Sequence, residues 1–187
     1  MVILGAVLVA AIVLVAVGAS RERAAEEDER VRSLRDWAAE HRWNFNEGDL
    51  RVPWRGQVGR DGFRVRELLT GDVGGLPVSL GHGTYPTRRV VTDANGDKRT
   101  ETVTNHLTVL VVRMDAERLD TDVKPGDPAR DHLSSDLIRA RLDDELPLWS
   151  LRQGELMVVR DTPLHLSDLD EHLGTARRLA ELLGHRF

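Results

Sequence analysis

The sequence predicts an α+β protein that begins with a transmembrane helix and continues into an antiparallel β-sheet of about five to six strands, built from β-hairpins and packed with about three α-helices. Three observations indicate this architecture. Residues 1–19 are apolar throughout, residues 63–114 alternate with the period of a strand around two turn dipeptides, and residues 167–184 repeat with the period of a helix.

Residues 1–19 carry no charged side chain, and as a helix they would be about 28 Å long, close to the hydrocarbon thickness of a bilayer. We therefore expect a membrane anchor, with the lipid bilayer as its partner. The alternative is a secretory signal that is cleaved after Val17-Gly18-Ala19, near Ser20, and leaves a secreted protein. The anchor is favoured because no Lys or Arg precedes the apolar run, and because the run exceeds the roughly 7–15 residues of a signal-peptide core.

Basic residues lie only on the carboxyl-terminal side of this apolar run. They are Arg21, Arg23, Arg30, Arg32 and Arg35. The positive-inside rule places them in the cytoplasm, so we expect a single-pass cell-membrane protein with a cytoplasmic carboxyl-terminal domain. Residues 20–33 are predicted to form a charged juxtamembrane stalk, either a solvated helix or a disordered linker, and residues 34–187 a single α+β globular domain.

A helix with one packing face is expected where this domain begins, because Leu34, Trp37, Ala38 and His41 follow the spacing i, i+3, i+4, i+7. Asn46, Gly48 and Pro53 are expected to break it.

The register of the central sheet follows from its turns. Gly74-Gly75 and Asn95-Gly96 are favoured two-residue hairpin loops, because both loop positions need positive φ. In the first hairpin this register makes Glu67 face His82. In the second it makes Leu80 face Val111 and Tyr85 face His106.

The last third of the chain is predicted as a loop over residues 120–128, a helix from Ser134 that stops at Pro147, a short hairpin around Gln153-Gly154, and a closing helix. A capping box of Ser167 and Asp170 would begin that closing helix. Its buried stripe would be Leu169, Leu173, Ala176, Ala180 and Leu183, with Gly184 at the C-cap.

Composition excludes several classes of protein. The net charge of −5 argues against a nucleic-acid binder, and the absence of cysteine excludes disulfide and thiol chemistry. The histidines lack metal-ligand spacing, so we expect no metal site and no cofactor. A protein partner is expected but unidentified, and the oligomeric state stays open.

Two pairs of residues are candidates for chemistry. Glu67 could hold His82 as a general base, or the two could be a cross-strand pair at the rim of the sheet. Tyr85 and His106 could line a small-ligand pocket, or could form an aromatic pair on the second face of the sheet. The glycines of Gly81-His82-Gly83 are expected to mark a bulge or the close approach of another element.

Four basic residues, Arg88, Arg89, Lys98 and Arg99, cluster near the tip of the second hairpin. They are candidates for contact with anionic lipid headgroups or an acidic partner. The alternative is that these charges protect an edge strand from aggregation.

Four segments stand out along the chain: the short apolar anchor, the segment from Leu34 to Trp43, the Thr-rich strand that ends in His106–Val112, and the closing Leu-rich helix. Together they resemble a group of small single-pass membrane proteins of unknown function from actinobacteria. The resemblance implies an anchored topology and supplies no activity, cofactor or catalytic residue.

The sequence thus favours a membrane-tethered, non-catalytic binding or scaffold module on the cytoplasmic face. The alternatives are a hydrolase-like enzyme that uses Glu67 and His82, and a sensor that encloses an apolar small ligand.

Overall fold

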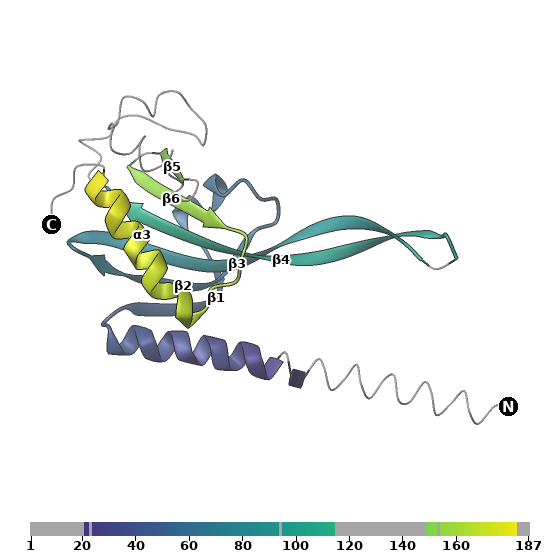
Figure 1. The fold of residues 1–187 in the computed structure, drawn as a ribbon, viewed down its shortest axis with the longest axis horizontal. Coiled ribbons are helices and arrows are strands. Elements are labelled where there is room, and N and C mark those ends of the chain that lie inside the picture. The colour runs from purple at the N-terminus through teal and green to yellow at the C-terminus, as the bar shows by residue number, and fades with distance from the viewer. Residues whose placement is uncertain (1–20, 23, 94, 115–148, 153, 183–187) are drawn as a thin grey trace.

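The computed structural model describes residues 21–22, 24–93, 95–114, 149–152 and 154–182 (Figure 1). These residues form one six-stranded antiparallel sheet in the order β1-β2-β3-β4-β6-β5. The strands are β1 (Asn44–Leu50), β2 (Arg64–Val73), β3 (Leu76–Thr92), β4 (Lys98–Arg113), β5 (Trp149–Arg152) and β6 (Glu155–Arg160). Helical elements are a helix over residues 24–40, the 3-10 helices η1 (Pro53–Gln57) and η4 (Leu166–Asp168), and α3 (Leu169–Leu182). The predicted α+β class with an antiparallel sheet is confirmed.

Several predicted elements lie outside the described residues. They are the anchor over residues 1–19, the loop over residues 120–128, the helix from Ser134, and the end of the last helix at Leu183 and Gly184. Within the part of the chain that is described, no helix is long and apolar enough to cross a bilayer.

Two of the three predicted hairpins have the expected two-residue loops. Val73 pairs with Leu76 around Gly74-Gly75, whose φ angles of 62° and 85° are those that favour glycine. Arg152 pairs with Glu155 around residues 153–154. The predicted pairing of Glu67 with His82 is confirmed as a result, because the first turn fixes the register of β2 against β3.

The register predicted for the second hairpin is wrong by one residue. Thr92 pairs with Lys98, so the loop spans residues 93–97, and Leu80 pairs with Leu110 rather than Val111. The Asp93 side chain stabilises this longer loop, because its Oδ1 accepts hydrogen bonds from the backbone N–H groups of Asn95 (2.9 Å) and Asp97 (3.0 Å). A shift of one residue moves every side chain of β4 to the opposite face of the sheet.

Strand β1 lies where the sequence predicted only the end of the first helix and residues that break a helix. It pairs with β2 from Asn44 opposite Thr70, at the edge of the sheet. Trp43, at its start, packs against Gly71, where a Cβ atom would lie 2.3 Å from the indole ring. This close approach requires glycine at that position.

The sheet is covered on both faces. The helix over residues 24–40 and α3 pack on one face, which we call the helix face, through Leu34, Ala38, Leu169, Ala176 and Leu179 (Figure 1). The segment around η1 covers the other face through Trp54, Val58 and Phe63. The predicted buried positions Leu34 and Ala38 are confirmed, and His41 lies beyond the helix end, stacked on Trp37 at 4.3 Å between ring centroids.

The glycines of β3 allow this second layer to come close. A Cβ atom at Gly81 would lie 2.7 Å from the Trp54 ring, and one at Gly83 would lie 2.6 Å from the Phe63 ring. The expected close approach of another element is therefore confirmed.

The last helix begins differently from the prediction. The 3-10 helix η4 precedes α3, and Ser167 donates a hydrogen bond to Asp168 Oδ1 (3.0 Å), so the predicted capping box with Asp170 is not what starts the helix. The stripe of Leu169, Ala176 and Ala180 is buried as predicted. His172 and Leu179 are buried as well.

Beyond the body of the sheet, β3 and β4 continue as a two-stranded ribbon, which we call the arm (residues 85–105; Figure 1). Pairing of β2 with β3 ends at Arg64 opposite Thr84, and pairing of β4 with β6 ends at Thr108 opposite Arg160. Among the described residues, the two strands of the arm therefore pair with each other alone.

Candidate functional site

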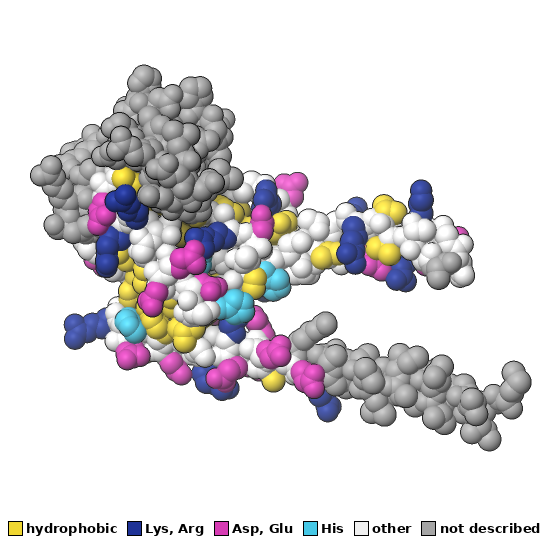
Figure 2. Space-filling view, viewed as in Figure 1, with side chains coloured by type: hydrophobic (Ala, Val, Ile, Leu, Met, Phe, Trp, Pro, Cys, Tyr) yellow, Lys and Arg dark blue, Asp and Glu magenta, His cyan; other side chains and the backbone are white. Residues whose placement is uncertain are grey.

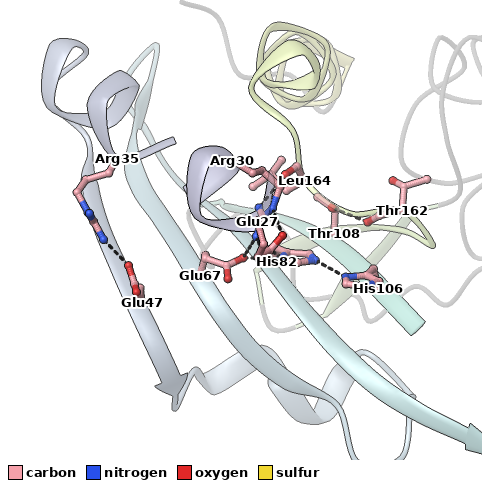
Figure 3. A network of polar contacts seen from close by, with 10 residues as sticks. All are labelled: Glu27, Arg30, Arg35, Glu47, Glu67, His82, His106, Thr108, Thr162 and Leu164. Atoms are coloured by element: carbon pink, nitrogen blue, oxygen red, sulfur yellow. Dashed lines mark hydrogen bonds and ion pairs between the residues drawn. The ribbon is translucent and has the colours of Figure 1, made fainter. Parts of the chain in front are cut away.

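A cluster of charged and imidazole side chains lies on the helix face, where the helix over residues 24–40 crosses the sheet. Figure 3 shows its members, which we call the Arg30 network: Glu27, Arg30, Glu67, His82 and His106. They come from one helix and three adjacent strands. No single stretch of sequence therefore contains the site.

The centre of the network is the predicted pair of Glu67 and His82. A β-bulge between Val65 and Glu67 turns the Glu67 side chain to the helix face, opposite His82. His82 is 1% exposed and Glu67 is 6% exposed, and a hydrogen bond joins His82 Nδ1 to Glu67 Oε2. Because Glu67 is a carboxylate that can only accept, Nδ1 carries the hydrogen, and the remaining nitrogen of neutral His82 is an acceptor.

Arg30 enters the site from the segment predicted as a charged stalk. Its side chain is only 8% exposed, and its Nη2 donates to Glu67 Oε2 at 3.0 Å. Its Nη1 donates to the carbonyl oxygen of Leu164 at 2.9 Å, and its Nε and Nη2 donate to Glu27 at 2.8 and 2.7 Å. Arg30 therefore connects the helix to β2 and to the segment that precedes η4.

Sequence reasoning missed Arg30, although a signal was present. Arg30 lies four residues before Leu34 and eight before Ala38, so it continues the buried stripe of the same helix by one turn. The sequence analysis placed Arg30 in a charged stalk, whereas the structure buries its side chain and pairs it with Glu27.

His106 links the buried pair to the surface. The register shift of β4 places it opposite Thr84, on the face that carries His82. His106 Nδ1 lies 3.1 Å from His82 Nε2, and the two rings are nearly parallel, with an interplanar angle of 2°. Since His106 itself is exposed, the network forms a continuous path from solvent through two imidazoles to a buried carboxylate.

The network also shifts the pKa values of its members. Burial raises the pKa of Glu67, but hydrogen bonds from His82 and Arg30 outweigh it and hold that pKa below 4.5. The hydrogen bond from Arg30 likewise lowers the pKa of Glu27. Burial, together with the neighbouring His82, lowers the pKa of His106 below 6.5.

The predicted pairing of Tyr85 with His106 is wrong, because Tyr85 pairs with Asn105 and points to the opposite face. There its hydroxyl donates to Asp161 Oδ1 at 3.1 Å, and the Arg60 guanidinium lies 5.7 Å from its ring centroid. The two side chains therefore do not line one pocket.

An open hollow of about 360 Å³ lies next to η1, away from the Arg30 network. Its lining is Arg55, Gly56, Gly59, Arg60, Asp61, Gly62 and Phe63. Charged side chains and glycines dominate this lining. It therefore lends no support to a sensor that encloses an apolar ligand between sheet and helices.

The four basic candidates, Arg88, Arg89, Lys98 and Arg99, all lie on the arm and are exposed (Figure 2). Arg89 and Arg99 share the carboxylate of Glu101, at 3.6 and 2.8 Å. Arg88 lies opposite Thr102, and Lys98 lies opposite Thr92.

Over the described ranges, no group of three or more His, Asp or Glu side chains is placed to hold a metal ion. No protein-family model, curated protein or solved structure matches the chain.

Proposed function

We propose that the chain is a membrane-tethered, non-catalytic binding module, anchored through residues 1–19 with its domain at the cytoplasmic face. One observation carries this proposal: Arg30, on the helix that follows the predicted anchor, is buried against Glu67 and Leu164. The contact fastens the sheet to the segment that emerges from the bilayer. The position of the sheet relative to the membrane is then set by the fold rather than by a loose linker.

The geometry of His82 favours a structural role over catalysis. Its Nδ1 is bonded to Glu67, its Nε2 is bonded to His106, and its side chain is 2% exposed. Neither ring nitrogen is free to take a proton from a substrate, which a general base must do at hydrogen-bond distance.

The tether can be tested in the natural background, because the chain has no cysteine. We would introduce Asp170→Cys at an exposed position of α3 and express the full chain in cells. We expect the protein to stay in the membrane fraction after extraction at alkaline pH, and a membrane-impermeant maleimide to label it only after permeabilisation. Recovery of a soluble chain beginning near Ser20, or labelling of intact cells, would contradict the proposal.

A second candidate, a hydrolase-like enzyme, is favoured by the exposed His106 at the end of the path through His82 and Glu67. In neutral form, His106 Nδ1 donates to His82 Nε2, which leaves its Nε2 lone pair at the surface as a base. Turnover of ester or phosphoester substrates that is lost in His106→Gln and retained in the matched surface variant His41→Gln would support this function. A chain without turnover on such substrates supports the binding module.

A further inference from the structure

The arm is unusual because it has little to pack against. Its two strands pair with each other alone among the described residues, and its side chains from Pro86 to Val90 are exposed on both faces. Two-stranded ribbons are marginally stable in water, so a contact outside the sheet would stabilise this one. Figure 2 shows basic, acidic and hydrophobic side chains along its free length.

Strand alternation sorts the charges of the arm onto two faces. Arg89 and Arg99 share one face with Glu101, which neutralises part of their charge. The other face, which we call the basic face, carries Arg88, Val90, Lys98, Thr100, Thr102 and Thr104. It holds no acidic side chain among the described residues of the two strands, and Val90 on it is 66% exposed.

The basic face continues the helix face of the sheet, since Arg88 and Val90 lie at even steps along β3 from His82. The helix over residues 24–40 lies on that face, and Figure 1 shows the arm leaving the sheet toward the side from which this helix starts. The basic face therefore continues the side of the sheet to which the predicted anchor leads.

Lengths along the two elements indicate how the arm meets the bilayer. From Thr84 to Thr92 the strand extends about 27 Å, whereas from Arg30 back to Arg21 the helix extends about 14 Å. An arm that pointed straight at the membrane would thus carry Asp93 and Asp97 about 13 Å beyond the start of the helix, past a headgroup layer of roughly 5–8 Å. Carboxylates are unfavourable in hydrocarbon, which argues against an arm that enters the bilayer and favours one that lies along its surface.

We propose that the arm lies on the bilayer that holds the anchor, with its basic face against anionic lipid headgroups. Arg88 and Lys98 provide the attraction, Val90 sits at the interface, and the threonines hydrogen-bond to the headgroup layer. This inference rests on the proposed tether and names anionic lipid as the second contact of the module.

The test uses the full chain reconstituted in vesicles, with a fluorescent probe on a single introduced cysteine. Thr100→Cys places the probe on the basic face, and Val91→Cys places it on the opposite face. In vesicles rich in phosphatidylglycerol, we expect nitroxide-labelled headgroups to quench the Thr100 probe strongly and the Val91 probe weakly. In pure phosphatidylcholine, or at high salt, we expect the difference to disappear.

Charge removal provides the matched comparison. Arg88→Gln with Lys98→Gln should lower the ratio of surface-bound to free arm about thirtyfold, since each basic residue near an anionic surface contributes about a fivefold factor. Arg89→Gln with Arg99→Gln removes the same charge from the other face and should lower the ratio much less. Equal effects of the two double variants would overturn the proposal.

Two further outcomes separate this inference from the tether. A chain that stays on neutral vesicles, but whose Thr100 probe is no more quenched on anionic lipid, retains the tether and overturns the lipid contact. That result would leave an acidic protein as the partner of the basic face. A chain that does not stay on neutral vesicles overturns the tether itself, and the lipid contact with it.

Discussion

Replacing Arg30 with methionine tests whether the Arg30 network fastens the helix over residues 24–40 to the sheet. The substitution keeps the apolar stem and removes the guanidinium. Glu67 then keeps only its bond to His82, and the carbonyl oxygen of Leu164 loses its charged donor. Both acceptors lie where the fold excludes most water, since the side chains of Arg30 and Glu67 are each 8% exposed.

The magnitude follows from this burial. Breaking a buried ion pair costs about 3–5 kcal/mol, because one charge is left without its partner. Glu67 retains one hydrogen bond, so we expect the lower end, about 3 kcal/mol. In a Glu67→Gln background the same substitution should cost about 1–2 kcal/mol less, because the two side chains interact directly.

Arg32→Met on the same helix is the control. Arg32 also pairs with a glutamate three residues earlier, Glu29, but the two side chains are 62% and 65% exposed. An exposed pair of this kind contributes roughly 0–0.5 kcal/mol. The control therefore matches residue type, helix and spacing, and differs in burial.

The assay is urea unfolding of the full chain in mild detergent, followed by tryptophan fluorescence. Trp37 and Trp43, whose rings lie 5.6 Å apart where this helix meets β1, report on docking of the helix. If Arg30→Met and Arg32→Met lower the free energy of unfolding by the same small amount, the network does not fasten the helix, and the reasoning fails.

Three further predictions follow from the structure. The free energy of unfolding should fall on acidification, first just below pH 6.5 and again below pH 4.5. His106, His172 and two glutamates have lowered pKa values in the folded state, so the unfolded chain binds more protons than the folded chain at these pH values. A midpoint of urea unfolding that rises below pH 6.5 would refute this. Gly83→Ala should lower the free energy of unfolding by at least about 2 kcal/mol, since its Cβ would lie 2.3 Å from a backbone oxygen. The control Gly56→Ala, whose Cβ would have nothing within 4 Å, should leave the melting temperature nearly unchanged. Asp93→Ala should remove two hydrogen bonds from the arm loop and raise amide exchange at its tip about fivefold without changing global stability; a large fall in global stability would mean that the arm belongs to the core.

The relation of sequence to site differs among the members of the Arg30 network. Glu67 and His82 were predicted as neighbours because the Gly74-Gly75 turn permits one register. His106 was placed on the wrong face, because Asp93 lengthens the second loop through its own side chain. Arg30 was assigned to a charged stalk, since its neighbours in sequence are almost all charged.

By itself, the sequence determined the properties that depend on neighbours along the chain. These are the α+β class, the two tight hairpins, the buried stripe of the last helix and the apolar run at the amino terminus. Local periodicity and positive φ at glycine are enough to specify them.

Only the tertiary structure decided which charged residues meet in the interior. Arg30 contacts Glu67 and Leu164, residues 37 and 134 positions away along the chain. Burial of an arginine depends on what the opposite surface offers, and a one-residue change in a hairpin loop decides which face His106 occupies. Neither can be obtained from a periodic pattern, because both depend on contacts between distant segments.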